Sequence, residues 1–346
     1  MRAVVFEDIG KVRVTEVPDA EIEGPHDAVV RVARSAICGS DLHFLHGKAP
    51  LSPGEGMGHE AVGVIEALGP AVSRFAPGDR VVVAFNIACG KCWFCARGET
   101  QLCEDFRNLG AGAFGGGLPG AQADLVRVPV ADVNLLRVPD DVDDERALFV
   151  GDVATTGLYA ASLAQIAPGE VVAIVGCGPV GFFCIQAALA QGAGRVFALD
   201  TEPKRLKLAE RVGGVPVNVG LRNPIMALAE QTGNRGADAV IEAVGSPQAY
   251  ESAIALVRRG GRVVVAGMYM GESMQIQLGV YWARALDVRF CGVCPVHTYW
   301  ERAMQEIVAG RIDPLPIVSH RLPLEDAALG YELFDNREAT KVVLLP

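Results

Sequence analysis

Residues 171–200 read VVAIVGCGPVGFFCIQAALAQGAGRVFALD, and this stretch decides the fold. An apolar run at 171–175 leads into a glycine-rich turn, and an apolar helical pattern at 180–193 leads into a second short apolar run at 195–200. This order is typical of a strand, a helix and a second strand that runs parallel to the first. The stretch therefore predicts the first βαβ unit of a parallel sheet.

The turn GCGPVG matches the G-x-G-x-x-G pattern of dinucleotide-binding proteins. This short pattern is a specific signal here because it lies between a predicted strand and a predicted helix. Glycines allow the turn to close and let the backbone approach a pyrophosphate at the helix N-terminus. The alternative is a glycine-rich turn that only packs the helix on the sheet. The predicted cofactor-binding residues of the turn are Gly176, Gly178, Pro179, Val180 and Gly181.

Asp200 stands at the end of the second strand of this unit. A carboxylate there accepts hydrogen bonds from the ribose hydroxyls of NAD and repels the 2′-phosphate of NADP, so NAD is the predicted cofactor. Without a dinucleotide, Asp200 would be a solvated strand end. Arg205, in the helix that follows, is expected to contact the same ribose, and an exposed arginine without a ligand is an equally good interpretation.

With 346 residues, the chain exceeds the size at which single hydrophobic cores stop growing, so two domains are expected. Strands and helices continue to alternate after the first unit, which predicts a doubly wound parallel sheet, a Rossmann cofactor domain over 154–292. Before it, short apolar runs broken by Gly and Pro predict an all-β, barrel-like domain. The chain ends in the strand-like KVVLLP, and we expect 293–346 to join 1–153 in that domain. The strand-like runs lie at 28–37, 61–68, 79–85 and 123–130, and then at 215–219, 237–245, 262–268 and 287–293.

The formal net charge of −10 disfavours nucleic-acid partners, because their binding rests largely on clustered Lys and Arg. No apolar run reaches the roughly 18 residues that a membrane span needs. The first residues alternate and carry charges, unlike a signal peptide. We therefore expect a cytoplasmic protein with a small-molecule partner, and neither a membrane nor a nucleic acid as partner.

Residues 89–103 read CGKCWFCARGETQLC and hold four of the nine cysteines. In a reducing compartment, closely spaced cysteines are more often metal ligands than disulfides. Their spacing suits a closed, tetrahedral, structural zinc site. One alternative is an iron–sulfur cluster, which would need Cys-Pro soon after the third cysteine, and another is a zinc ribbon for nucleic acid, which the acidic charge disfavours. The predicted zinc ligands are Cys89, Cys92, Cys95 and Cys103.

A second set of ligand types is spread over ICGSDLH, GMGHE and GDVATTG. Cys38, His59 and Asp152 would supply a thiolate, an imidazole and a carboxylate, and catalytic zinc needs three protein ligands and one open position. Spacing alone does not bring them together. Taken singly, a buried cysteine, a core histidine and a helix N-cap aspartate are the commoner interpretations.

Together these residues resemble the zinc-dependent medium-chain alcohol dehydrogenases, and the resemblance covers essentially the whole chain. CGSDLH, GHEAVG, CGKCWFC and GCGPVG occur in the order and spacing of that family. The likeness is greatest to bacterial NAD-dependent enzymes that assemble as homotetramers. It implies a GroES-like catalytic domain, two zinc ions per chain, and reversible oxidation of primary or secondary alcohols to aldehydes or ketones with NAD as hydride acceptor.

The resemblance also assigns roles around the catalytic zinc. It makes Cys38, His59 and Asp152 the ligands and Glu60 a neighbouring or exchanging carboxylate. Asp41 matches the acid that orients the ligand histidine. Many relatives have cysteine as third ligand, so the harder oxygen of Asp152 should leave the zinc more electrophilic.

A proton relay and the remaining contacts follow from the same resemblance. Ser40 matches the hydroxyl that takes the proton of the alcohol and passes it, through the nicotinamide ribose, to His43. Gly39 stands where relatives often carry a basic residue, so NAD release is expected to be faster. The further matches are Thr156 and Val180 at the nicotinamide, Lys341 at the pyrophosphate and Phe85 in the substrate pocket, where an ordinary core aromatic is an equally good interpretation.

Other functions remain open at this point. The same scaffold serves polyol, vicinal diol or amino-alcohol dehydrogenases, which substrate profiling would separate. A zinc-free quinone or enoyl reductase fits poorly, because it has no use for the two ligand sets. A different class is a non-enzymatic, zinc-stabilised binding or sensor protein that holds NAD.

Overall fold

The structure is a computed structural model that describes residues 1–346, and its chain forms two compact units. The first consists of Met1–Thr155, Pro295–Val308 and Val318–Pro346, and the second of Thr156–Cys294 and Ala309–Ile317. We expected all of the C-terminal part to join the first domain, but 309–317 belongs to the second unit. There the Gln186 side chain donates to the Asp313 carbonyl at 3.2 Å and accepts from the Asp313 N–H at 2.7 Å.

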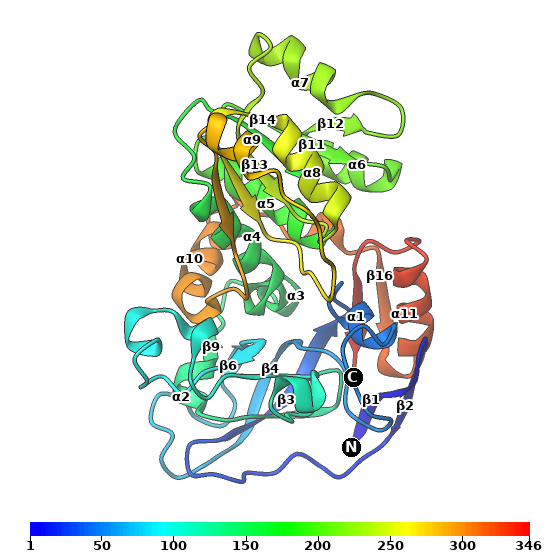
Figure 1. Ribbon diagram of the computed structural model, residues 1–346. Helices are drawn as coiled ribbons and strands as arrows, with labels where there is room; N and C mark the ends of the chain where they lie inside the picture. Colours follow the sequence, from blue (N-terminus) through cyan, green and yellow to red (C-terminus); the bar gives the residue numbers. More distant parts are fainter. The chain divides into compact units, whose positions relative to one another are not determined.

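The first unit is built on a seven-stranded sheet with the order β16-β17-β3-β4-β5-β9, in which β8 also pairs with β3 (Figure 1). Its other strands form the β1–β2 hairpin and the short β6–β7 pair. The sheet strands are β3 (Ala28–Ala36), β4 (Glu60–Leu68), β5 (Arg80–Val83), β8 (Leu125–Val128), β9 (Leu135–Arg137), β16 (His320–Pro323) and β17 (Val342–Leu345). The remaining strands are β1 (Arg2–Asp8), β2 (Lys11–Glu16), β6 (Asn86–Ile87) and β7 (Arg107–Asn108).

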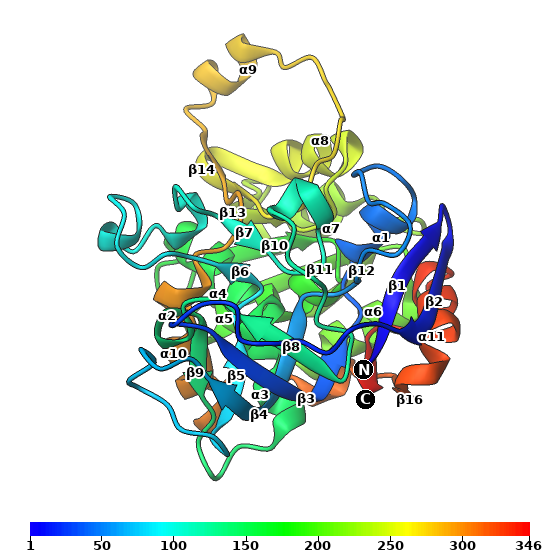
Figure 2. The ribbon, with the colours of Figure 1, turned by 90° about the horizontal axis from the view of Figure 1, so that it is seen from below.

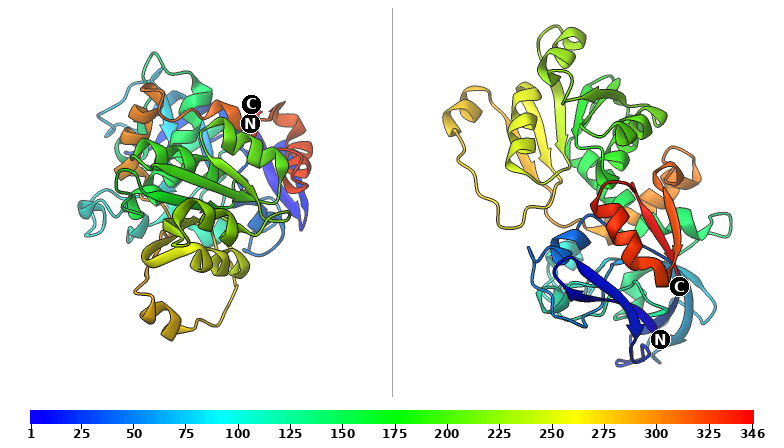
Figure 3. Two further views of the ribbon diagram at one scale, coloured as in Figure 1. Left: turned by 90° about the horizontal axis from the view of Figure 1, so that it is seen from above. Right: turned by 90° about the vertical axis from the view of Figure 1, so that its right-hand side faces the viewer.

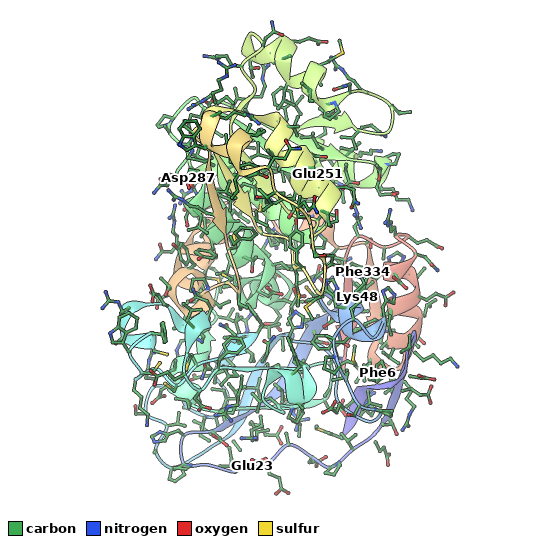
Figure 4. All side chains as sticks on the ribbon, viewed as in Figure 1. Phe6, Glu23, Lys48, Glu251, Asp287 and Phe334 are labelled. Carbon is green, nitrogen blue, oxygen red and sulfur yellow. The ribbon has the colours of Figure 1, made fainter.

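The end of the chain completes this sheet. β17 pairs antiparallel with β3, Val343 opposite Ala36 and Leu344 opposite Ser35, and parallel with β16. The termini lie close together within the unit (Figure 3). Phe6 of β1 and Phe334 of α11, both labelled in Figure 4, are buried in the unit. The expected barrel-like β domain is thereby confirmed, and β17 lies in its main sheet.

Short helices fill the connections of the first unit. They are α1 (Asp41–Leu45), α2 (Ala131–Asn134), α3 (Asp144–Leu148), α10 (Val296–Val308) and α11 (Ala327–Asp335), with 3₁₀ turns at Cys95–Arg97, Thr100–Leu102, Gly112–Gly115, Phe149–Gly151 and Leu324–Asp326. α4 (Val153–Leu163) runs from the first unit into the second.

The second unit is a parallel sheet of six strands in the order β12-β11-β10-β13-β14-β15. The strands are β10 (Val171–Val175), β11 (Arg195–Asp200), β12 (Val215–Asn218), β13 (Ala237–Glu242), β14 (Val257–Val265) and β15 (Asp287–Phe290). The central strands are buried almost throughout, as expected for a sheet covered on both faces. The doubly wound parallel sheet is confirmed, although β14 begins before the predicted 262–268.

The helices of the second unit are α5 (Pro179–Ala190), α6 (Pro203–Arg211), α7 (Pro224–Thr232), α8 (Pro247–Leu256) and α9 (Leu278–Ala283), with a 3₁₀ turn at Leu315–Ile317. The first four begin with proline, whose fixed backbone angle suits the first helical position and whose missing N–H costs nothing there. α9 lies on an open loop that extends away from the sheet (Figure 2). None of the helices in the chain has the length and apolar character needed to cross a membrane.

Candidate metal centres and cofactor site

The four cysteines of 89–103 converge. Cys89 Sγ lies 4.0 Å from Cys95 Sγ, and Cys92 Sγ lies 3.9 Å from Cys103 Sγ. A tetrahedron of thiolates around zinc has edges of about 3.8 Å, because each Zn–S bond is about 2.3 Å. A disulfide needs about 2.05 Å, and an iron–sulfur cluster spreads its thiolates over several iron atoms. The geometry fits one tetrahedral ion.

The backbone of this loop stabilises thiolates. The Cys89 N–H points to Cys103 Sγ at 3.2 Å, and the Cys92 N–H points to Cys89 Sγ at 3.4 Å. Backbone hydrogen bonds lower the pKa of Cys92 to about 6, whereas burial raises the pKa of Cys95 to about 12. Four thiolates this close repel one another, so a bound cation is what would allow all four to ionise.

The second ligand set also converges, because of the register between two strands. Ala36 of β3 pairs with Glu60 of β4, so the residues just outside this pair, Cys38 and His59, lie at the same end of the sheet. Asp152 enters from the turn before α4. Its Oδ2 lies 3.2 Å from His59 Nε2 and 3.6 Å from Cys38 Sγ.

These distances suit a metal. Tetrahedral zinc would place a nitrogen and an oxygen ligand about 3.4 Å apart, and a sulfur and an oxygen ligand about 3.6 Å apart. All three side chains are buried, and their ligand atoms lie within 4.8 Å of one another. The residues that sequence alone could not bring together therefore form a three-ligand set, which in tetrahedral zinc coordination leaves the fourth position to another ligand.

Asp41 fixes the orientation of the histidine. Its Oδ1 lies 3.0 Å from His59 Nδ1, and its Oδ2 accepts from the Cys38 N–H at 2.9 Å. A proton on Nδ1 leaves the Nε2 lone pair free for a metal. Burial opposes a charged ring, but Asp41 and Asp152 raise the pKa of His59 above its ordinary value. A cation at Nε2 would take the place of that second proton.

Sequence reasoning missed a further member of this site, Gln122. Its Nε2 donates to the Ala36 carbonyl at 3.1 Å and to Asp41 Oδ2 at 3.4 Å, while Tyr331 donates to its Oε1 at 2.9 Å. Gln122 ends a glycine-rich loop with no periodic pattern, so no local signal indicated that its side chain is fully buried.

Glu60 and Lys341 form an ion pair and both are fully buried. Burial raises the pKa of Glu60 to about 7 although Lys341 opposes this shift, and its Oε1 has no hydrogen-bond partner. The Lys341 ammonium contacts this carboxylate and is not exposed to solvent. In the structure, the partner of Lys341 is thus Glu60, whereas we expected the pyrophosphate of the cofactor. Glu60 itself does not belong to the converging set of Cys38, His59 and Asp152.

Ser40 of the predicted relay and Phe85 of the predicted pocket lie beside the same histidine. Ser40 Oγ lies 3.3 Å from His59 Nε2. The Phe85 ring meets the His59 ring edge-on, with the ring centres 5.9 Å apart, and is nearly buried. His43 lies half-buried in α1, which starts directly after Ser40. The structure therefore places a hydroxyl and an aromatic wall beside the proposed metal position.

In the second unit, the glycine turn has the geometry of an anion site. Gly176 has a φ of +91°, and a Cβ on Gly181 would lie 1.9 Å from the Gly176 carbonyl oxygen. At Gly178, the residue before α5, a Cβ would meet only Arg205 Nη1, at 4.0 Å. The turn follows β10. From β10 the strand order continues to β11 and β12 on one side and to β13, β14 and β15 on the other, which makes this the switch point of the sheet.

Asp200 organises the turn from the next strand. Its Oδ2 accepts from the Cys177 N–H at 2.8 Å, and its Oδ1 accepts from the Glu202 N–H at 2.9 Å. Arg205 Nη1 lies 3.9 Å from Asp200 Oδ2. Val180 in α5 and Thr156 in α4 are half-buried. The charged pair therefore stands beside the open Gly178, where a ribose would meet it.

Comparisons with known proteins agree with both units. Residues 24–140 match the alcohol dehydrogenase GroES-like domain, and residues 179–309 match the zinc-binding dehydrogenase family. The chain is 36% identical to the zinc-type alcohol dehydrogenase-like protein AdhB of Bacillus subtilis over the full length of both. It is 30% identical to the sorbitol dehydrogenase of Bacillus subtilis, over 100% of this chain and 97% of the relative.

A solved structure is similar over nearly the whole chain. Alcohol dehydrogenase TADH from Thermus sp. ATN1 aligns with a TM-score of 0.96 and 43% identity, covering 100% of this chain and 99% of that one. The full-length similarity and the two ligand sets lead to one conclusion: the chain belongs to the zinc-dependent medium-chain alcohol dehydrogenases.

Proposed function

We propose that the protein is an NAD-dependent alcohol dehydrogenase that holds two zinc ions per chain and interconverts primary or secondary alcohols with aldehydes or ketones. The observation that carries this proposal is the convergence of Cys38, His59 and Asp152 with the Ser40 hydroxyl at the same imidazole nitrogen. A zinc ion held by the three ligands would supply a Lewis acid that lowers the pKa of a substrate hydroxyl.

The side chains around this position have complementary tasks. Asp41 holds the His59 ring in the tautomer that presents Nε2. Ser40 would accept the proton of the substrate hydroxyl and pass it on through the nicotinamide ribose toward His43, while the hydride leaves the carbon that bears this hydroxyl for NAD. Phe85 contributes an apolar wall against which the substrate carbon chain packs. The alcohol thus loses one proton and one hydride, which balances oxidation to the carbonyl.

Cofactor choice rests on Asp200. A carboxylate beside the ribose favours two free hydroxyls over a 2′-phosphate, so NAD is proposed over NADP. The four-cysteine site is proposed to bind the second zinc, in a structural role, because it is complete with four protein ligands and leaves no open position.

We further propose that the protein assembles as a homotetramer, as the resemblance implies. β15, which begins at Asp287 (Figure 4), is an edge strand of the second unit. Near it, Trp282 of α9 is 85% exposed and Phe290 of β15 is 64% exposed. Exposed apolar groups beside an open sheet edge favour association between chains. Light scattering of the wild type and of Trp282→Glu tests this, with a smaller assembly expected for the variant.

The activity is tested by following NADH formation with zinc-loaded protein and a panel of ethanol, hexanol, sorbitol, 2,3-butanediol and threonine. Turnover with the simple alcohols is expected, and removal of zinc by a chelator should abolish it. Turnover with sorbitol or the diol alone would instead assign a polyol dehydrogenase, the substrate class of one relative. NAD binding without turnover on any substrate would support the non-enzymatic alternative and contradict the proposal.

A further inference from the structure

Glu242 is a fully buried acid that the proposed chemistry does not use. It ends β13, the strand beside β10 at the switch point of the sheet. Its Oε1 accepts from the Val244 N–H at 2.6 Å and from the Gly245 N–H at 2.9 Å. A buried carboxylate with two backbone donors fixes the turn that follows it, because any other path of the turn would leave the carboxylate unsatisfied.

Tyr269 joins a second turn to this carboxylate. Its hydroxyl lies 3.1 Å from Glu242 Oε2 and 3.1 Å from the Ser246 carbonyl oxygen. The first turn, 243–246, follows β13, and the second, 266–269, follows β14. We call the two side chains the Glu242–Tyr269 clasp, since together they join the turns.

The two turns touch so closely that only glycine fits between them. Gly245 has a φ of +82°, and a Cβ there would lie 2.2 Å from the Met268 carbonyl oxygen. A Cβ on Gly267 would lie 2.1 Å from the Gly245 nitrogen and 2.7 Å from Glu242 Oε2. The hydrogen bonds of the clasp therefore hold together two turns whose backbones are already in close contact.

The clasped turn reaches the glycine turn of the cofactor site. The Ala243 N–H donates to the Val175 carbonyl at 2.8 Å. A Cβ on Gly176 would lie 2.4 Å from Val244 Cγ2, so the Val244 side chain covers the first glycine of the fingerprint. Val244 is nonetheless 54% exposed, so its apolar side chain is open to solvent at the carboxyl end of the central strands.

We propose that Glu242 and Tyr269 are positioning residues for the dinucleotide, and that their clasp holds Val244 as an apolar surface against which the bound cofactor packs. The inference rests on the proposed function, because it requires a dinucleotide on the glycine turn. Glu242 and Tyr269 touch no substrate and act only through Val244.

The test measures the Kd of NAD and of NADH for the zinc-loaded protein by calorimetry, without substrate. Tyr269→Phe and Val244→Ala should each raise Kd about 3- to 15-fold, the range of one lost hydrogen bond or one partly lost apolar contact. The matched control is Thr232→Val, which removes a buried hydroxyl that bonds only to the Leu228 carbonyl and the Gly236 N–H in the same unit, and it should leave Kd within about 2-fold. Unchanged Kd values in Tyr269→Phe and Val244→Ala would overturn the inference.

Two further measurements separate positioning from general stability. In Glu242→Gln the amide oxygen still accepts from both backbone N–H groups, and the amide nitrogen can donate to Tyr269, so Kd should stay close to the wild-type value. The double variant Tyr269→Phe/Val244→Ala should bind NAD more tightly than the sum of the two single penalties predicts, because both act through one contact. Fully additive penalties would show that Tyr269 does not act through Val244 and would overturn the inference.

NAD binding by the wild type separates a failure of the proposed function from a failure of the inference alone. If it binds neither NAD nor NADP, the proposed function fails and the inference falls with it. If it binds NAD and the clasp variants bind equally well, only the inference fails.

Discussion

Asp152 decides the character of the proposed catalytic zinc site. One thiolate, one imidazole and one carboxylate make a formally neutral site around Zn²⁺, and the carboxylate oxygen donates less electron density than a second thiolate would. Asp152 is nearly buried and has both other ligand atoms within 3.6 Å of its Oδ2. Because its Oδ2 lies beside both other ligand atoms, its removal should affect the metal first.

Asp152→Ala is expected to lose the catalytic zinc and nearly all turnover, while NAD binding and the four-cysteine zinc remain. Two ligands seldom hold zinc, and the substitution is remote from the other site. Zinc content by elemental analysis, NAD binding by calorimetry and NADH formation together check this. A variant with both zinc ions and most of its turnover would assign the third ligand elsewhere, first to Glu60.

Asp200 is the second residue with a decisive charge. Asp200→Gly combined with Thr201→Arg should raise the ratio of kcat/KM with NADP to kcat/KM with NAD by about 10- to 100-fold, since it removes a repulsion and adds a phosphate partner. Asp200→Gly alone is the control for the added arginine. Because Asp200 also accepts from the Cys177 and Glu202 N–H groups, weaker binding of both cofactors is expected as well. An unchanged ratio would show that the ribose is recognised by other residues.

The role of a residue could be predicted from the sequence where the residue belongs to a local pattern. The glycine turn and the cysteine spacing each indicate a site by themselves, whereas Cys38, His59 and Asp152 were joined only by the family resemblance. Gln122 and Tyr269 could not be found at all, because their partners are remote in the sequence and no spacing rule links them. The resemblance alone placed Lys341 at the pyrophosphate, and no local pattern indicated that its ammonium is buried against Glu60.

At the scale of elements, α10 is connected to the four-cysteine loop by a half-buried histidine, His297. His297 Nε2 lies 2.8 Å from Asn134 Oδ1, and His297 Nδ1 lies 2.9 Å from Thr100 Oγ1. Asn134 Nδ2 donates to the Ala88 carbonyl, so its Oδ1 must accept, and the proton of the ring sits on Nε2. A neutral imidazole therefore connects the helix to the strand end that leads into Cys89.

Protonation of His297 should loosen this connection. Burial lowers its pKa from 6.5 to about 4, so the unfolded chain binds the proton more readily than the folded one. The stabilisation is complete above the unfolded pKa and is lost as pH falls from about 6.5 toward about 4, by up to about 3 kcal/mol. Urea unfolding of the wild type and of His297→Gln at several pH values checks this.

The comparison with His297→Gln cancels the loss of zinc from protonated cysteines, which both proteins share. The stability difference between them should be largest near neutral pH and shrink as the pH falls. A difference that stays constant across this range would show that His297 does not titrate in the way its burial implies.

Element boundaries followed the sequence where a local signal precedes the element: α5 starts at Pro179, directly before the helical pattern predicted from 180. They failed at β14, which the structure starts at Val257, whereas we expected this strand only at 262–268. Tertiary pairing explains this, since Ala237 of β13 pairs with Val257 and a bulge precedes the pairing of Ala239 with Arg262. Propensity at 257–261 could not reveal that partner.

At the scale of the whole molecule, two zinc ions and no iron are expected per chain. The two ligand sets lie in the same unit, but one is closed with four thiolates and the other is open with three mixed ligands. Elemental analysis of protein purified without added metal checks the count. One zinc per chain, or visible absorbance from iron and sulfide, would contradict it.

The position of β17 has a consequence for synthesis on the ribosome. β17 is made after both of its partners, β3 and β16, yet it lies between them, so the sheet that carries Cys38 and His59 stays incomplete until translation has passed Leu345. Nearly all of the second unit is one continuous stretch that ends at Cys294, and it emerges a few seconds earlier at roughly 5 to 20 residues per second. Nascent chains should therefore acquire a folded nucleotide-binding unit first. During that interval the end of β3 that pairs with β17 has no partner strand. An unpaired strand edge can pair with other chains, so aggregation and chaperone binding are expected at this stage.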